Sequence, residues 1–185
     1  MNIDIDYLME DAQAGDAYAQ FILGNCYYYG DNLNQDYEQA AFWFKKSACQ
    51  GDIKAQYMLG ECYYLGLGIK QDHRQAIFWF MKAAEQNDIE AQRNLGDCYY
   101  YGNGVEQNYN EAVKYFKKAA EEDFAPAQYS LAVCYYEGNG VKQNYEKAVE
   151  LFKKATKQDF VPAQFNLGVC YYYGEGVEQD YEKSI

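Results

Sequence analysis

The chain has 185 residues, of which 49% are apolar, and a formal net charge of −12 at pH 7. This length and apolar content suffice for a buried core and exclude an intrinsically disordered chain. The acidic surface repels nucleic-acid phosphates and anionic lipid headgroups, so we expect no nucleic-acid partner and no membrane partner. A basic or neutral protein partner is favoured, although the same charge also serves simply to keep a protein soluble.

Residues 1–16 precede the repeating part of the chain. They lack the basic segment and apolar run of a signal peptide, and no stretch of the chain approaches the ~18 consecutive apolar residues of a membrane span. We therefore expect a cytoplasmic protein. Tyr7, Leu8 and Ala12 match the spacing of a helix that recurs later in the chain, which predicts an N-terminal covering helix within residues 1–16.

The rest of the chain repeats with a period of 36 residues. We treat residues 1–185 as one domain, in which the covering helix precedes units at 17–52, 53–88, 89–124 and 125–160 and a partial unit at 161–185. Ala19, Leu23 and Tyr27 are spaced by four, which places them on one face of a helix. This first helix recurs in every unit, where its Ala-Gln pair stands at Ala19, Ala55, Ala91, Ala127 and Ala163.

A short glycine-containing loop follows the first helix of each unit. Its first glycine, Gly30 in the first unit, suits the left-handed position that ends a helix, and the second glycine suits another turn with positive φ. Asn32 replaces the second glycine in the first unit and tolerates the same conformation. These glycines separate two helices, because a phosphate-binding loop would need a preceding strand and a third glycine in register.

A second helix follows each loop and begins at a good N-cap residue. These caps are Asp36, Asp72, Asn108, Asn144 and Asp180. Its buried stripe carries small and aromatic residues, which in the first unit are Ala40, Trp43, Phe44 and Ala48. One helix pair cannot bury both of its apolar stripes, so successive pairs are expected to stack into a continuous core.

Two further features concern helix ends. Pro126 and Pro162 fall in the first turn of first helices, where no intrahelical hydrogen bond is lost. The fifth unit starts its second helix at residues 181–185 and then stops. Because a stacked array must cover its last apolar face, we interpret this end as truncated. The alternatives are that it pairs with a partner or with a second copy, which would make it a site of self-association.

The six cysteines invite a disulfide or metal interpretation. Five occupy the same place in successive first helices, and packed helices lie ~8–10 Å apart, beyond the ~7 Å between Cα atoms that a disulfide spans. We therefore expect apolar core thiols in a reducing compartment at Cys26, Cys62, Cys98, Cys134 and Cys170. His73, the single histidine, replaces a tyrosine, so we expect a surface or packing role rather than a catalytic one. No nucleophile with its base and no metal-ligand spacing is found, so we predict no catalytic residue, no metal and no cofactor.

The repeated pattern is Ala-Gln-x-x-Leu-Gly-x-x-Tyr-x-x-Gly-x-Gly-Val, followed by Asp/Asn-Tyr-x-x-Ala and an aromatic pair. It resembles the Sel1-like repeat, a relative of the tetratricopeptide repeat. The resemblance implies an all-α fold, a right-handed α-solenoid of antiparallel helix pairs with a concave groove, and an adaptor or scaffold role. A cysteine-rich secreted branch of that family bridges the helices of each unit with a second cysteine. Here only the first unit has one, Cys49.

Tetratricopeptide-like geometry implies which side chains face the groove. Some of them stand two residues or one residue before the repeated leucine. Others stand one residue after the glycine that follows this leucine, or at the second tyrosine of the first helix. The predicted groove residues are Phe21, Tyr28, Tyr57, Glu61, Tyr64, Arg93, Asn94, Asp97, Tyr100, Tyr129, Tyr136, Phe165 and Tyr172. The units differ most clearly around Arg93, Asn94 and Asp97, where we expect specificity. The alternative is that the aromatic residues only seal one unit against the next.

We weigh three classes of function. The favoured class is a non-catalytic scaffold or adaptor that binds a peptide or protein in its groove, because the units repeat in phase and no catalytic constellation is found. The second is small-molecule binding or a hydrolase-like activity, since cysteine-rich relatives are associated with penicillin binding and β-lactam hydrolysis. The third is a structural module of a longer chain.

Overall fold

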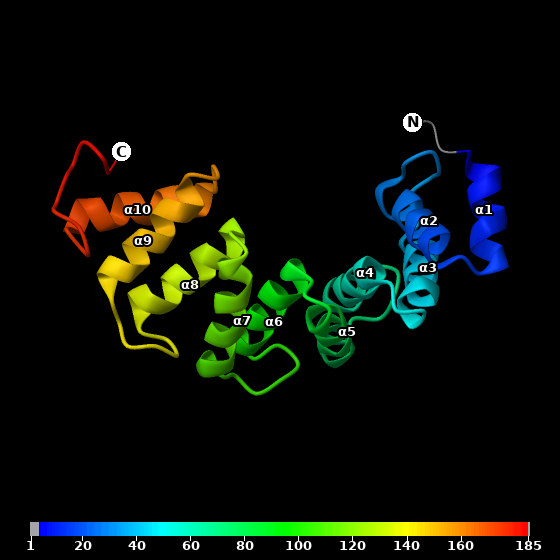
Figure 1. Cartoon of the computed structure of the whole chain (residues 1–185), viewed down its shortest axis with the longest axis horizontal. Helices are drawn as coiled ribbons and strands as arrows, with labels where there is room; N and C mark the ends of the chain where they lie inside the picture. The colour runs from blue at the N-terminus through cyan, green and yellow to red at the C-terminus, as the bar shows by residue number, and fades with distance from the viewer. Residues whose placement is uncertain (1–3, 185) are drawn as a thin grey trace. The chain divides into compact units, whose positions relative to one another are not determined.

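The computed structural model describes residues 4–184, which form ten α-helices joined by short loops and contain no strand. The predicted all-α fold, with repeats of about 36 residues, is confirmed. The chain divides into two compact parts, Met1–Ala91 and Gln92–Ile185, each of which holds more than one of the 36-residue repeats (Figure 1). These two parts are here called the N-terminal and C-terminal units, and the 36-residue units are called repeats. Within residues 4–184 no helix is both long enough and apolar enough to cross a membrane.

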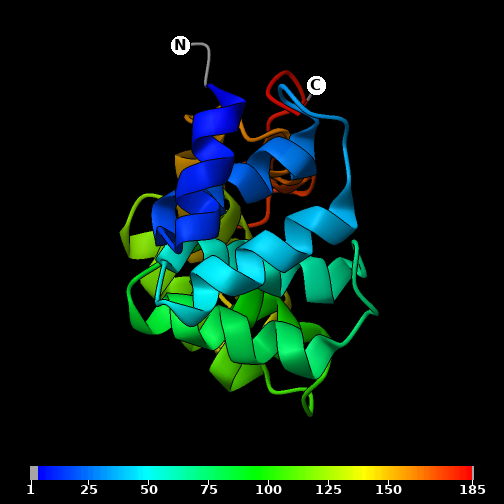
Figure 2. The ribbon, with the colours of Figure 1, turned by 90° about the vertical axis from the view of Figure 1, so that its right-hand side faces the viewer.

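The N-terminal unit contains the helices α1 to α5, in chain order. They are α1 (Ile5–Ala14), α2 (Ala17–Tyr29), α3 (Tyr37–Cys49), α4 (Ile53–Leu65) and α5 (His73–Glu85). Each of them packs against the next along the chain. Figure 2 shows this unit facing the viewer, with α1 in dark blue beside α2. The described part of the predicted covering segment is thus the helix α1, whose buried Ala12 contributes to the core.

The C-terminal unit repeats the same arrangement. Its helices are α6 (Ile89–Tyr101), whose first three residues belong to the N-terminal unit, and then α7 (Tyr109–Glu121), α8 (Ala125–Glu137), α9 (Tyr145–Thr156) and α10 (Val161–Tyr173). The helices α7 to α10 pack in chain order, and the Tyr99 ring of α6 stacks on the Tyr115 ring of α7 at 5.7 Å. Paired helices of one repeat are therefore in direct contact.

The helices begin and end where the sequence predicts. The Asp36 carboxylate accepts hydrogen bonds from the backbone N–H groups of Glu38 and Gln39, at 2.9 and 3.0 Å, and so caps α3. Gly30 ends α2 in the left-handed conformation with φ 76°. Pro126 and Pro162 lie in the first turns of α8 and α10, whose N-cap residues make no side-chain cap bond.

The second glycine of each loop has a role that its turn conformation alone does not explain. Gly140 has φ +70°, and a Cβ atom at this position would overlap the backbone carbonyl of Tyr109, at the start of α7. Gly176 meets Tyr145 in the same way. The loop of one repeat thus rests on the second helix of the repeat before it, and only glycine permits this approach.

The last described residues differ from the prediction. Asp180 accepts hydrogen bonds from the backbone N–H groups of Glu182 and Lys183, at 3.1 and 3.2 Å, as an N-cap does. Residues 181–184 nevertheless form bends and a turn rather than the start of a helix, because a helical nucleus is unfavourable until further turns follow it. Ile185, like residues 1–3 of the predicted covering helix, lies outside the described residues.

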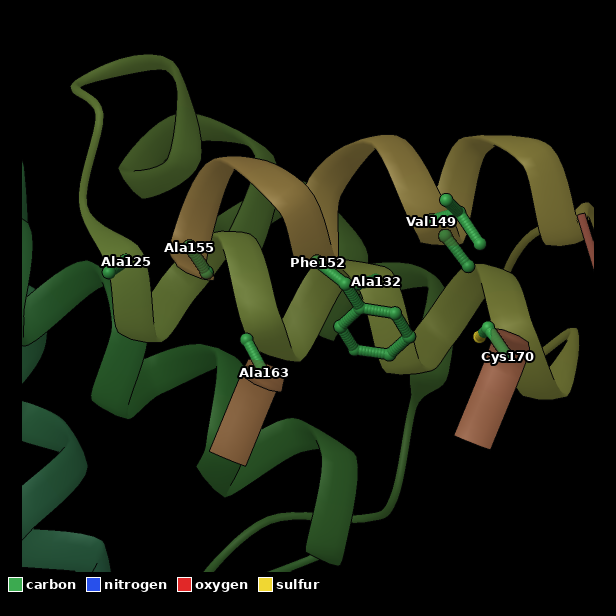
Figure 3. Packing of buried hydrophobic residues seen from close by; sticks show 8 residues of the cluster. Ala125, Ala132, Val149, Phe152, Ala155, Ala163 and Cys170 are labelled. Carbon is green, nitrogen blue, oxygen red and sulfur yellow. The ribbon is translucent and has the colours of Figure 1, made fainter. Parts of the chain in front are cut away.

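One phenylalanine of each second helix forms the centre of each repeat core. Phe44, Phe80, Phe116 and Phe152 are all fully buried. A Cβ atom at Gly24 would lie only 2.6 Å from the Phe44 ring, so the small residue of the first helix makes room for this ring. Ala132 takes the glycine's place beside Phe152, as Figure 3 shows. Ala163 and Cys170 of α10 face the same cluster (Figure 3).

Candidate functional site

The predicted groove aromatics lie on the first helices, against the central phenylalanine of their own repeat. Phe21 is 6.2 Å from Phe44 between ring centroids, and Tyr57 is 6.0 Å from Phe80. Tyr129 has the same relationship to its own repeat's phenylalanine. The second tyrosines, Tyr28, Tyr64 and Tyr100, approach the phenylalanine of their own repeat at 6.1 to 6.3 Å. These side chains are partly buried, so one part of each supports the core and another part faces solvent.

Two of the second tyrosines also join successive repeats of the C-terminal unit. The Tyr100 hydroxyl donates to Glu137 Oε2 at 2.5 Å and accepts from Asn139 Nδ2 at 3.0 Å. The Tyr136 hydroxyl donates to Glu175 Oε2 at 2.5 Å. The pKa of both phenols is raised. Burial is the larger cause for Tyr100, followed by the hydrogen bond to Glu137, whereas the hydrogen bond to Glu175 is the larger cause for Tyr136, followed by burial.

The remaining predicted residues differ in exposure. Phe165 and Tyr172 of α10 are exposed, and the Tyr172 ring meets Tyr181 at 5.4 Å. Glu61 lies half-buried on α4. Asn94 is half-buried on α6 and accepts a hydrogen bond from Arg93 Nη1 at 3.2 Å.

Three of the predicted residues line one cavity. Asp97 and Tyr100 of α6 and Tyr129 of α8 enclose about 80 Å³, within the C-terminal unit. We call this cavity the Asp97 pocket. Its full lining is Asp97, Tyr100, Tyr101, Phe116, Tyr129, Ser130 and Val133. The pocket therefore combines aromatic walls with one carboxylate and one aliphatic hydroxyl group, that of Ser130.

Asp97 is a strongly perturbed carboxyl group. Its side chain is 18% exposed and lies 2.8 Å from Arg93 Nη2, one helical turn away. Burial raises the Asp97 pKa to about 6, against the opposing effect of the Arg93 guanidinium. A carboxyl group whose pKa is raised in this way marks a candidate functional position, because perturbed pKa values cluster at functional sites.

The sequence interpretation missed two residues of the Asp97 pocket that carry polar groups. Ser130 occupies in its own repeat the place that Asn94 has in the repeat before, and Asn94 was among the predicted residues. Tyr101 ends a run of tyrosines and is replaced by Glu137 in the next repeat. Comparing repeats position by position would have identified both.

Exposed apolar side chains on the second helices of the N-terminal unit were also missed. Phe42 and Phe78 are each 48% exposed. The Lys46 ammonium lies 4.8 Å from the centre of the Phe42 ring. The equivalent residues of the C-terminal unit are Lys114 and Glu150, so this apolar character belongs to the first two repeats.

A wider hollow of about 480 Å³ lies among α7, α8 and α9. Its rim carries charges of both signs, including Lys117, Glu121, Lys147, Glu150 and Lys154. Lys154 and Glu150 already pair at 3.0 Å. Such mutually neutralised and exposed charges are typical of a solvated helix surface.

The cysteines carry no chemistry that the geometry supports. All six are free thiols, of which only Cys49 is exposed. Burial raises the pKa of Cys62 and Cys134 to about 12, which keeps these thiols protonated and unreactive near neutral pH. His73 packs its ring 5.0 Å from Tyr64, as expected from its replacement of a tyrosine. Among residues 4–184 no three His, Cys, Asp or Glu side chains are grouped to hold a metal ion.

Comparison with known proteins gives consistent matches. The Sel1 repeat family matches residues 17–52, 53–88, 89–124, 125–160 and 161–185. A protective antigen of uropathogenic Escherichia coli with an SLR fold is 34% identical, with a TM-score of 0.81 over 99% of this chain and 47% of its own. A Sel1 repeat protein from Oxalobacter formigenes is 33% identical, with a TM-score of 0.87 over 92% of this chain and 68% of its own.

A more distant neighbour is cysteine rich protein B of Helicobacter pylori. It is 27% identical, with a TM-score of 0.54 over 65% of this chain and 91% of its own. No curated protein sequence matches the chain. The chain spans about half the length of the Escherichia coli antigen that it resembles.

Proposed function

Because the chain belongs to the Sel1 repeat family, whose members are generally scaffolds for protein interactions, we propose that it is a non-catalytic scaffold that binds a peptide or protein. Each unit contributes the faces of its own first helices, α2 and α4 in the N-terminal unit and α6, α8 and α10 in the C-terminal unit. The alternative of a small-molecule or hydrolase-like activity has no specific observation in its favour. Members of the family are generally non-catalytic.

The observation that carries this proposal is the convergence of non-repeating residues on α6 and α8. Positions that are the same in every repeat build the core. Arg93, by contrast, stands where the other four repeats have an aromatic residue. The position of Asp97 also varies, with Asn25, Glu61, Val133 and Val169 in the other repeats. Tyrosine and arginine are the side chains most often found as binding anchors. Tyr100 and Tyr129 lie beside this polar pair, so the surface has both anchor types in one place.

The net charge and the thiols add two further elements to the proposal. A net charge of −12 favours a basic or neutral partner over an acidic one. Free cysteines, including the exposed Cys49, suit a reducing compartment and support our proposal of a cytoplasmic location.

A peptide-display selection against the whole chain tests the proposed surface. We expect enriched peptides to lose at least about tenfold in affinity when Arg93 is replaced by alanine, because interface anchors contribute on this scale. Arg74→Ala is the matched control, since Arg74 is exposed at the start of α5 and the same charge is removed. Equal binding by both variants and the parent chain would reject the surface on α6.

A further inference from the structure

We propose that the Asp97 pocket binds the ammonium group of a lysine side chain from the partner. This inference deepens the proposed scaffold function and rests on it. The pocket offers the two features that recognise an ammonium ion, a carboxylate and the faces of aromatic rings. Asp97 supplies the carboxylate, and Tyr101, Tyr129 and Phe116 contribute aromatic walls.

The carboxylate can bind a second cation although Arg93 already contacts it. Arg93 Nη2 approaches Oδ2 of Asp97. An ionised carboxylate has about four acceptor positions on its two oxygens, so one guanidinium contact leaves capacity for an ammonium N–H. The Ser130 hydroxyl lines the same cavity and provides a further acceptor type. Glu137, held by Tyr100, adds a second negative charge near the cavity.

The third repeat differs from its neighbours at the position whose ring packs against the central phenylalanine in those repeats. Phe21, Tyr57 and Tyr129 each place a ring against the central phenylalanine of their own repeat. The corresponding residue of the third repeat is Arg93, which turns to Asp97 instead. The ring pair made in those repeats therefore has no equivalent at Phe116, whose side chain contributes to the cavity wall.

The size of the pocket selects the kind of ligand. Its volume of about 80 Å³ exceeds the roughly 10–15 Å³ that a cavity needs to hold one water molecule. It is far below the roughly 300–1,000 Å³ of sites that enclose a metabolite or drug-sized ligand. The pocket therefore accommodates the end of one side chain. A carboxylate-bearing side chain is excluded by repulsion from Asp97 and Glu137.

Amine titration of the isotopically labelled protein, followed by NMR, tests the pocket directly. The probe is n-butylammonium, with n-butanol as the uncharged and n-butylguanidinium as the planar cationic comparison. We expect saturable shifts of the Asp97, Tyr101, Ser130 and Val133 amides with butylammonium, and at least about tenfold weaker binding of butanol, as for loss of a charged hydrogen bond. Equal binding of butanol, or tighter binding of butylguanidinium, would overturn the inference.

Single substitutions test whether the butylammonium shifts arise from binding in the Asp97 pocket. Asp97→Asn is expected to abolish the saturable butylammonium shifts, whereas Glu106→Gln removes one exposed acidic charge elsewhere and is expected to leave them unchanged. Ser130→Leu fills the cavity without altering Asp97 and is expected to block binding as well, which provides a second test if Asp97→Asn perturbs the fold. Retained binding in folded Asp97→Asn or Ser130→Leu protein would contradict the proposal.

Peptides from the display selection separate this inference from the proposed function. A lysine in the selected peptide is replaced by norleucine, which keeps the alkyl chain and removes the charge. We expect at least about tenfold weaker binding to the parent chain and a much smaller change with Asp97→Asn. Peptides that bind without any dependence on lysine would refute the pocket and leave the scaffold intact. Butylammonium binding without any selected peptide would refute the scaffold and leave the pocket.

Discussion

Arg93 Nη2 lies 2.8 Å from Asp97 Oδ2, one turn further along α6, yet this contact does not offset the burial of the carboxylate. Burial raises the Asp97 pKa to about 6 even though the guanidinium lowers it. Above that pH the folded chain holds an ionised group in an unfavourable place. Such local destabilisation is characteristic of binding sites, where a group is placed for its ligand rather than for stability.

Replacing Asp97 by asparagine is therefore expected to stabilise the protein near neutral pH. The ordinary aspartate pKa of 3.8 is raised to about 6 in the folded chain, and each unit corresponds to about 1.4 kcal/mol. We expect Asp97→Asn to increase the free energy of unfolding by roughly 1–3 kcal/mol at pH 7.5, allowing for the lost Arg93 contact. Urea unfolding measures the change.

The control is the pH dependence of the difference in unfolding free energy between Asp97→Asn and the parent chain. The folded chain binds the Asp97 proton more tightly than the unfolded chain, so the destabilisation is fully present above the folded pKa of about 6 and lost as pH falls toward 3.8. The stability advantage of Asp97→Asn over the parent should shrink steadily from pH 7 to pH 4. A difference that is constant with pH, or that grows on acidification, would show that Asp97 is not buried in this way.

Replacing Gly140 by alanine is expected to destabilise the protein for two reasons, and comparison with Gly51→Ala distinguishes them. Alanine there must adopt a left-handed conformation, which costs about 1–2 kcal/mol, and its Cβ would overlap the Tyr109 carbonyl. Gly51 also has positive φ, but a Cβ there meets nothing within 4 Å. We expect Gly140→Ala to destabilise by ~1–3 kcal/mol more than Gly51→Ala, the range for overpacking. Thermal unfolding of both variants measures it, and equal effects would rule out the close approach.

The contrast between these two glycines shows what the sequence can and cannot specify. Spacing and cap residues predicted the helices, because Asp36 and Gly30 act through neighbours a few residues away. The same reasoning explained the second glycine by its turn alone. Its contact with Tyr109 joins residues of different repeats, which depends on how repeats stack. A local pattern carries no such information.

The candidate site shows the same division. Asp97, Tyr100 and Tyr129 were predicted from the groove positions of a related repeat, and they line one cavity. The prediction did not reveal that the aromatics rest on the central phenylalanines, as Phe21 rests on Phe44. Nor did it include Ser130, whose equivalent in the preceding repeat, Asn94, does not line the pocket. Periodicity identifies equivalent residues such as Asp97 and Val133, whereas the pocket also includes residues whose equivalents lie outside it.

Tyr136 is expected to stabilise the contact between the fourth and fifth repeats through its hydroxyl. That group donates to Glu175 at 2.5 Å in a partly buried position. Tyr136→Phe should lower the free energy of unfolding by about 1 kcal/mol, the usual net value of one hydrogen bond. Tyr173→Phe serves as the control, since Tyr173 is 65% exposed. Urea midpoints that shift equally for both variants would argue against a stabilising Tyr136–Glu175 bond.

The thiols are expected to divide into one reactive and five protected groups. Cys49 is exposed, while the cysteines of the first helices are buried, and burial raises the pKa of Cys170, for example, to about 11. Because the thiolate is the reactive form, a thiol reagent at pH 7.5 should modify one site per native chain rapidly. Intact mass measures the number of adducts, and Cys49→Ala should remove the rapid phase. Rapid modification of several sites in the native protein, or an unchanged rate in Cys49→Ala, would contradict the buried placement of the repeated cysteines.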